Sequence, residues 1–193
     1  MDTAIRTRAA LMIWAATKRV SVLCMAALML LAGIASAGAA QVTIVALGTS
    51  NTVGRGVPSQ ESYPTQLQSL LRAKGYDVHV INMGVNGDST AGILARVNSV
   101  PSGTRLVLLE FAAPNEAKHG ITNTAANVAE IQSRLAARNI KSIDLSGTFQ
   151  NEHRAAAASG NLVDTPAGPH LNGVVYGQIA AQVLPQVEAA IGR

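Results

Sequence analysis

Short aliphatic runs alternate with longer amphipathic segments beyond position 41, and this alternation predicts the fold. Four runs are typical of buried β-strands, at 42–47, 78–81, 105–109 and 140–145. Apolar residues recur at helical spacing in three segments, 63–74, 123–138 and 174–191. Pro185 is expected to bend or shorten the last helix, and residues 150–165 show neither period and are expected to be irregular. Strand and helix in alternation predict a parallel sheet with helices on both faces.

The carboxyl ends of the predicted strands are where a ligand site is expected. In open sheets of parallel strands, ligands bind in the crevice outside those ends. The segments that leave them begin at Gly48, Met83, Glu110 and Leu145. Chemistry-bearing residues in these four segments therefore matter more than those elsewhere.

The first forty residues have the pattern of an export signal. Basic residues precede an apolar run at 20–35, and Ala35-Ser36-Ala37 supplies the small residues that signal peptidase requires. We expect residues 1–37 to be a signal peptide, cut after Ala37 or Ala40, and the mature protein to be periplasmic or secreted by a bacterium. The alternative is an uncut membrane anchor, but the run is short for a span of roughly 20 residues. No membrane span is expected after processing.

Charge and cysteine content narrow the function further. The formal net charge is +4, yet beyond the first twenty residues eleven basic side chains face ten acidic ones. The mature chain has no basic stripe and few aromatics, which argues against nucleic acid as a partner. The single cysteine, Cys24, lies in the leader, so no disulfide, thiolate nucleophile or cysteine metal site is expected. The histidines lack the spacing of metal ligands, and no cofactor is expected.

A serine follows the first predicted strand in the sequence G-T-S-N-T-V-G-R-G, residues 48–56. Its hydroxyl and its own N–H can both face the ligand side, because the flanking glycines allow a sharp turn. Neither a Walker loop nor a dinucleotide fingerprint is present. Ser50 is therefore a candidate nucleophile, the alternative being an ordinary strand-to-helix turn.

This loop resembles the first block of the SGNH (GDSL-type) hydrolases, G-D-S-x-T-x-G-x-G, with Thr49 in place of the aspartate. The sequence E-S-Y-P-T-Q-L at 61–67 is similar to the next segment of bacterial lysophospholipase/thioesterase and arylesterase members. The sequence I-N-M-G-V-N-G-D-S-T at 81–90 looks like the second block, and the resemblance runs from position 42 to about 96. It implies a three-layer α/β/α, flavodoxin-like domain over residues 41–193, with about five parallel strands.

The resemblance also implies roles in acyl transfer. Ser50 would be the nucleophile, and its N–H, the Gly87 N–H and an asparagine of the third block would hold the oxyanion. That block diverges here, since Ala113 and Pro114 stand where the family has glycine. Asn115 is the best match for the asparagine, with a loop or cap residue as the alternative. Pro114 is expected to present it differently, because proline restricts the backbone on both sides.

The fourth block would supply the base. His170 stands before the last predicted helix, as in the family, but the position three before it is Ala167 rather than aspartate. Asp164 is a candidate replacement that would orient the ring. Alternatively, a backbone carbonyl or a water holds the ring, and serine and histidine act as a dyad.

The remaining polar candidates have less specific expectations. His79 is expected at a strand edge or in the core, and His119 in a solvated loop or against substrate. His153 has no evident partner in the sequence. Asp88 is expected to cap the helix that follows it.

These patterns together predict a serine hydrolase that cleaves carboxylic esters or thioesters through an acyl-serine. Its partner would be a small acyl ester or thioester. The alternative is a catalytically impaired protein of the same fold that binds acyl or glycan ligands in the cell envelope. That alternative rests on the changes at Thr49, at Ala113-Pro114 and at Ala167, which all fall in catalytic blocks.

Overall fold

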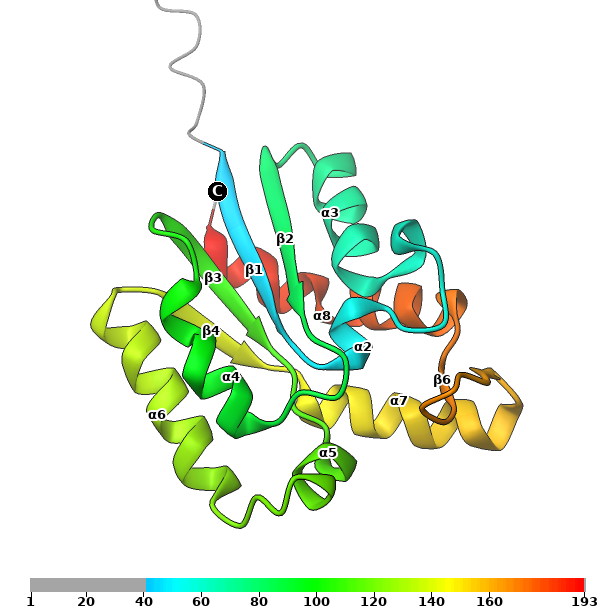
Figure 1. Ribbon diagram of the computed structural model, residues 1–193. Coiled ribbons are helices and arrows are strands. Elements are labelled where there is room, and N and C mark those ends of the chain that lie inside the picture. The colour runs from blue at the N-terminus through cyan, green and yellow to red at the C-terminus, as the bar shows by residue number, and fades with distance from the viewer. Residues whose placement is uncertain (1–40, 193) are drawn as a thin grey trace, which may run out of the picture. The chain divides into compact units, whose positions relative to one another are not determined.

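A computed structural model describes residues 41–192, and its centre is one parallel sheet (Figure 1). The sheet has four strands in the order β2-β1-β3-β4. Their bounds are Val42–Gly48 for β1, Val78–Gly84 for β2, Thr104–Leu109 for β3 and Lys141–Asp144 for β4. The α/β fold class predicted from the alternation of strands and helices is confirmed, and all four predicted runs are strands.

Helices connect the strands and cover the sheet. Those before β3 are α2 (Ser50–Val53), α3 (Tyr63–Ala73) and α4 (Thr90–Arg96), with short 3₁₀ turns at Ser59–Glu61 and Val97–Ser99. Those after β3 are α5 (Ala113–Lys118), α6 (Thr124–Ala137), α7 (Ser146–Ser159) and α8 (Gly173–Ile191). The helices predicted at 63–74, 123–138 and 174–191 are thus present to within one residue at each end.

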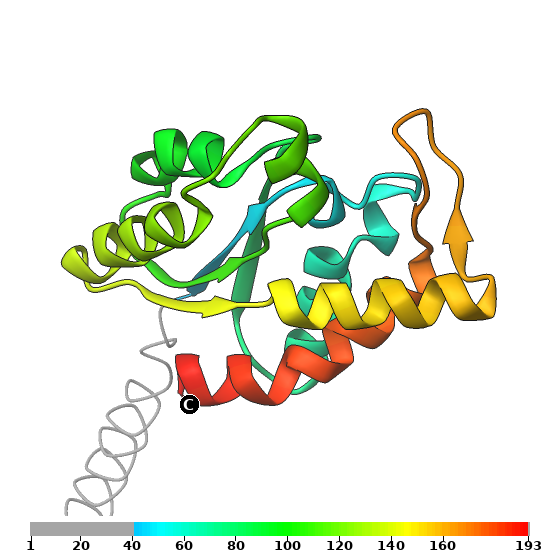
Figure 2. The same ribbon diagram turned by 90° about the horizontal axis from the view of Figure 1, so that it is seen from below.

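Alternate residues of the central strands enter two separate cores, which makes the domain three-layered (Figure 2). Ile44 and Ala46 of β1 pack with side chains of α3, α7 and α8. Val45 and Leu47 pack on the other face with α4 and α6. The period of two along β1 and β3 explains this, because successive side chains of a strand point to opposite faces. Both faces are apolar, as a covered parallel sheet requires.

The strand register brings the carboxyl ends of the strands to one edge. Gly48 of β1 lies beside Gly84 of β2, and Leu47 lies beside Leu109 of β3. Leu109 in turn lies beside Asp144 of β4. The loops that follow these residues therefore leave the sheet side by side, where the sequence predicted a site.

The sheet has four strands rather than the expected five or so. Two further short strands, β5 (Leu162–Val163) and β6 (His170–Leu171), pair only with each other, antiparallel. The segment between α7 and α8 offers two consecutive aliphatic residues, Leu162 and Val163, which is too short a run to add a buried strand. This small ribbon instead carries His170 toward the sheet edge.

The prediction of an irregular stretch was wrong, and one of the two effects expected of Pro185, a shortened helix, is absent. The stretch from 150 onward is mostly helical, because α7 extends to Ser159. Phe149 and Ala156 are the buried residues of α7, so it lacks the stripe of large apolar residues that marks an amphipathic helix. Pro185 does not shorten α8, which continues to Ile191. Proline leaves the carbonyl of Ala181 without its helical partner, and both residues are exposed, so water can bind there.

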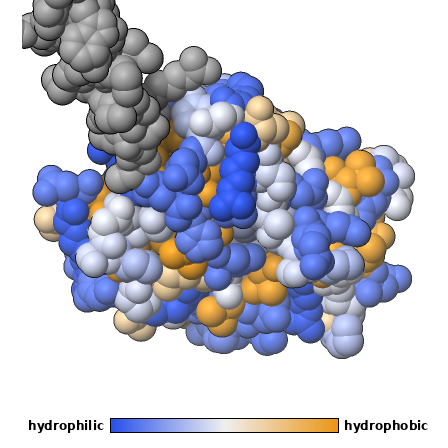
Figure 3. Space-filling view, turned by 90° about the horizontal axis from the view of Figure 1, so that it is seen from above, coloured by the Kyte–Doolittle hydropathy of each residue, from blue (hydrophilic) through white to orange (hydrophobic). Residues whose placement is uncertain are grey.

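The surface of the described part is mixed in character. In the view of Figure 3, apolar residues appear in small groups among polar ones, as is usual for a folded domain. Between positions 41 and 192 no helix is both long and apolar enough to cross a membrane. The predicted signal peptide and its cleavage sites lie outside the described residues.

Candidate active site

Ser50 lies at the start of the short helix α2, directly beyond β1. Thr49 before it is extended, with φ −101° and ψ −150°, and Gly54 ends the helix in the left-handed region at φ 81°. The chain therefore turns sharply out of a buried strand and into one turn of helix. Ser50 is 9% exposed, so little of the residue is accessible to solvent.

His170, in β6 and 120 positions later in the chain, lies beside Ser50. Its Nε2 lies 2.9 Å from the Ser50 Oγ, and its Nδ1 lies 2.9 Å from the carbonyl oxygen of Gly168. A carbonyl can only accept, so Nδ1 carries the proton and Nε2 presents its lone pair to the serine hydroxyl. This is the tautomer that a general base for Ser50 needs. The structure brings together the two residues that the sequence placed 120 positions apart.

Asp164 does not reach the imidazole, so the triad, one of the two arrangements that the sequence left open, is not formed in this structure. Asp164 is exposed, and the Nδ1 partners are the Gly168 carbonyl and the Thr165 hydroxyl, at 2.9 and 3.2 Å. The Thr165 hydroxyl also lies 2.7 Å from the same carbonyl. A compact turn at 165–168 holds the ring, which corresponds to the alternative of a backbone acceptor.

Gly87, the predicted oxyanion glycine, lies at a tight turn after β2. The Asp88 N–H donates to the Val85 carbonyl at 3.2 Å, and Gly87 has φ +74°. Among described residues other than glycine only Asn139 has a positive φ, so Asn86 does not, and the turn is of type II. Such a turn needs glycine at its third position, which is a structural reason for Gly87.

Helix α5 presents Asn115 to this turn. Pro114 lies in the first turn of α5, where a missing N–H costs nothing because that position has no helical partner. The Asn115 Nδ2 donates to the Asp88 carbonyl at 2.8 Å, leaving its second hydrogen available. His119, at the end of α5, donates from Nε2 to the Gly87 carbonyl at 2.8 Å. The substituted third block thus forms a helix, α5, that is hydrogen-bonded to the second block at residues 87 and 88.

Glu116, which is buried, holds α5 in this position. Its carboxylate accepts the Thr90 N–H at 2.7 Å and the Thr90 hydroxyl at 2.6 Å. It also accepts the Thr124 hydroxyl at 2.9 Å. One side chain therefore joins the starts of α4 and α6 to α5.

Asp88 does not cap α4, contrary to expectation. The cap is Ser89, whose hydroxyl accepts the Gly92 N–H at 3.3 Å. Asp88 instead pairs with Arg96 at 2.7 Å. The same guanidinium donates to the carbonyls of Met83 and Gly48, at 2.7 and 2.9 Å. Arg96 therefore fixes the ends of two strands next to Ser50.

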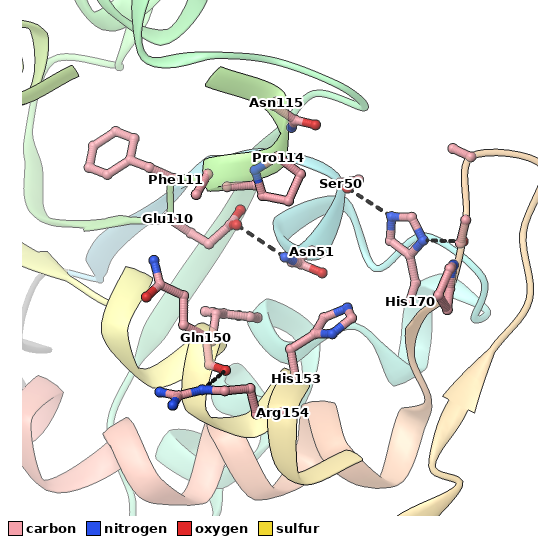
Figure 4. A pocket seen from close by; sticks show the side chains of 16 residues that line it. Ser50, Asn51, Glu110, Phe111, Pro114, Asn115, Gln150, His153, Arg154 and His170 are labelled. Carbon is pink, nitrogen blue, oxygen red and sulfur yellow. Dashed lines mark hydrogen bonds between the residues drawn. The ribbon is translucent and has the colours of Figure 1, made fainter. Parts of the chain in front are cut away.

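Ser50, Asn115 and His170 share a pocket of about 560 Å³ (Figure 4). The β3–α5 connection and the start of α5 line one side of it, and α7 lines another. Gly87 is not among the residues that line it. In the described part of the chain, no three His, Cys, Asp or Glu side chains gather where a metal could bind.

Comparison with solved structures identifies the fold. A structure of TesA matches 77% of this chain and 99% of its own, with a TM-score of 0.60 and 19% identity. AlinE4, an SGNH-hydrolase family esterase, matches 82% of this chain and all of its own, with a TM-score of 0.52 and 23% identity. The fold is that of the SGNH hydrolases. The resemblance predicted from the first two blocks is confirmed at the level of fold.

Relatives found by sequence carry esterase names. Esterase TesA of Pseudomonas aeruginosa is 30% identical over 100 residues, which are 51% of this chain and 47% of that protein. An arylesterase of Vibrio mimicus is 34% identical over 82 residues, 42% of this chain and 41% of its own. The matched part therefore spans less than half the length of either relative. No family model matches the chain.

Glu110 is a site residue that the sequence reasoning missed. It directly follows β3 and is completely buried. Its carboxylate accepts the Thr49 N–H at 2.8 Å and the Thr49 hydroxyl at 2.9 Å. It also accepts the Thr52 hydroxyl at 3.0 Å and the Asn51 amide at 3.2 Å. Residues on both sides of Ser50 are therefore bound to one carboxylate.

The sequence did contain a signal for Glu110, because this charged residue directly follows a run of four aliphatic residues. Its negative charge acts on two buried tyrosines. Burial, with a smaller contribution from the negative charge of Glu110, raises the pKa of Tyr63 and of Tyr176 well above the ordinary value. Both hydroxyls therefore stay protonated in the native protein.

Proposed function

We propose that this protein is a serine esterase that cleaves carboxylic esters or thioesters by a serine–histidine dyad. The observation that carries the proposal is the 2.9 Å contact between the His170 Nε2 and the Ser50 Oγ. The opposite ring nitrogen is bound to a carbonyl, so the basic nitrogen faces the nucleophile. The SGNH fold and the esterase names of the sequence relatives support the same reaction class.

The reaction follows from these positions. His170 takes the hydroxyl proton as the Ser50 Oγ attacks the ester carbonyl, and the collapsing intermediate expels the alcohol or thiol, which takes that proton from His170. Water then attacks the acyl-serine with His170 again as base, releasing the acid and restoring the serine. We propose that the N–H groups of Ser50 and Gly87 and the Asn115 amide stabilise the oxyanion.

The Gly168 carbonyl takes the place of the aspartate in this proposal. It fixes the proton on Nδ1 and orients the ring, but it lacks the full negative charge that would stabilise the imidazolium. The Thr165 hydroxyl, 3.2 Å from Nδ1, reinforces this position. We therefore assign no catalytic role to Asp164.

Hydrolysis of p-nitrophenyl butyrate by the purified protein tests the proposal. Ser50→Ala and His170→Ala should each lose activity by about 10⁴-fold or more, because the two groups act as a unit. Asp164→Ala should retain wild-type activity, and so should Ser69→Ala, an exposed serine on α3. Full activity in Ser50→Ala would refute the acyl-serine route. A large loss of activity in Asp164→Ala would show instead that Asp164 acts as the third member of a triad.

A fluorophosphonate probe separates the esterase from the ligand-binding alternative. It reacts only with an activated serine, so the wild-type protein should be labelled and Ser50→Ala should not. Folded protein that neither hydrolyses esters nor takes up the probe would favour a binding protein of the same fold.

We also propose that the protein is exported, on the sequence of residues 1–37. The mature chain should begin at Gly38 or Gln41. Fractionation of a bacterial host with N-terminal sequencing of the periplasmic or secreted product tests this. An uncut chain in the membrane fraction would contradict it.

A further inference from the structure

The pocket beside Ser50 has two unlike walls. One wall is apolar and comes from the end of β3, the start of α5 and the first turn of α7; its residues are Phe111, Ala112, Ala113, Pro114 and Phe149. The other wall is a polar row on α7, made of Gln150, His153 and Arg154 (Figure 4). A substrate lying in the pocket meets hydrocarbon on one side and nitrogen donors on the other.

The charge in this pocket is unbalanced. Glu110 is the single carboxylate among the lining residues, and its charge is covered by donors from residues 49–52. Arg154 is the single Lys or Arg among them. It takes part in none of the ion pairs formed within residues 41–192. The accessible part of the pocket therefore has a cation without a counter-ion.

Arg154 is held in place on α7. Its Nη2 donates to the Asn151 Oδ1 at 2.6 Å, and its Nε points to the Gln150 carbonyl at 3.4 Å. These contacts leave Nη1 available to a ligand. His153 is half-buried, and its ring points into the space between Asn51 and His170 (Figure 4). Both side chains line the same pocket from one helix, so an anionic group bound there can accept a hydrogen bond from either.

We propose that the preferred substrates are esters with an anionic group, a carboxylate or a phosphate, that binds Arg154 and His153. The inference rests on the proposed esterase function of Ser50. The anion would be separated from the scissile carbonyl by a short apolar chain lying on the exposed wall of Ala113 and Pro114. The chemistry of the reaction is unchanged, and the α7 row selects which ester is bound.

Matched esters that differ only in charge test the inference. Mono-p-nitrophenyl adipate carries a free carboxylate, and its methyl ester has the same chain without the charge. A second pair, monoacylglycerol phosphate and monoacylglycerol with one acyl group, carries the anion on the leaving-group side. The readout is the ratio of kcat/KM for the anionic ester to that for the neutral one in each pair.

The wild-type ratio should exceed about fivefold in one of the two pairs, the size expected for a partly exposed ion pair. The pair that shows it identifies a carboxylate or a phosphate as the bound group. Arg154→Gln should lower that ratio by about fivefold, and Arg154→Lys by less. Sodium chloride at about 0.5 M should also reduce it, because salt screens exposed charges. Arg134→Gln is the control, since Arg134 lies on α6 and pairs with Glu130.

Three outcomes would overturn the inference: wild-type ratios near one in both pairs, a ratio unchanged in Arg154→Gln, or a preference that survives in the double variant His153→Gln/Arg154→Gln. Failure of the esterase proposal is a different result. In that case neither the neutral nor the anionic ester is hydrolysed, and Ser50→Ala matches the wild type.

Discussion

Replacing Glu110 by glutamine should weaken both the fold and the reaction. The carboxylate accepts from four groups, and all four belong to residues 49, 51 and 52 around the nucleophile. A glutamine has the same shape but brings an NH₂ group in place of one oxygen. If its oxygen stays with the Thr49 N–H, the NH₂ group faces the Asn51 amide, and two donors meet.

The magnitude follows from these contacts. One hydrogen bond to a charged acceptor is lost outright and the others are weakened, and each such bond contributes about 1.5–3 kcal/mol. Removing a buried charge that has no cationic partner recovers part of this. We expect a net loss of about 2 kcal/mol in the free energy of unfolding. A shift of the Ser50 turn should also lower kcat by about tenfold to a hundredfold, since catalysis depends on sub-ångström placement.

Urea unfolding and steady-state hydrolysis of p-nitrophenyl butyrate measure the two effects. Glu130→Gln is the matched control, because Glu130 is exposed on α6 and its pair with Arg134 should contribute no more than about 0.5 kcal/mol. Loss of stability with unchanged kcat and unchanged fluorophosphonate labelling would refute the positioning role. A variant as stable and active as the wild type would refute both parts of the reasoning.

Three further predictions concern other contacts of the site and core. Gly84→Ala should cost about 3 kcal/mol of stability, because its Cβ would meet backbone atoms of α2 and, at 2.9 Å, the carbonyl oxygen of Thr49 just before that helix. Urea unfolding checks this, with Gly147→Ala, which has open space, as the control. Thr165→Val should lower kcat by about threefold to tenfold, the value of one hydrogen bond in the turn that holds His170; unchanged kinetics would show that the carbonyl suffices alone. The free energy of unfolding should fall as pH rises above about 10, because Tyr63 and Tyr176 lose their protons there in the unfolded chain but keep them in the native protein. Absorbance at 295 nm should show that both tyrosines ionise only when circular dichroism reports unfolding, and ionisation before unfolding would contradict the prediction.

Most of the fold could be predicted because its signals are local. Strands β1 and β3 are aliphatic runs, β2 begins with one and β4 lies between Ile140 and Leu145, while the helices α3, α6 and α8 carry large apolar residues at helical spacing. Helix α7 was missed because most of it faces solvent and alanine marks neither face. The count of about five strands came from the family resemblance, and the chain between α7 and α8 lacks the apolar length to supply another.

The site could be predicted only in part, since sequence blocks locate residues but not their partners. Ser50, Asn115 and His170 are brought to one pocket. Asp164 is not, because nothing in its spacing fixes where a carboxylate points. Glu110 was missed because its role depends on long-range packing, since it binds residues about sixty positions earlier in the chain.

The carbonyl that orients His170 has a consequence for how such sites are recognised. Every residue has a main-chain carbonyl oxygen, so comparison of sequences does not reveal which one orients the histidine. No single substitution removes it. Residues 164 and 167 are then free to vary as long as the chain keeps the turn at 165–168. A search that requires an acidic residue before the histidine would discard this chain, although its serine and histidine are in contact.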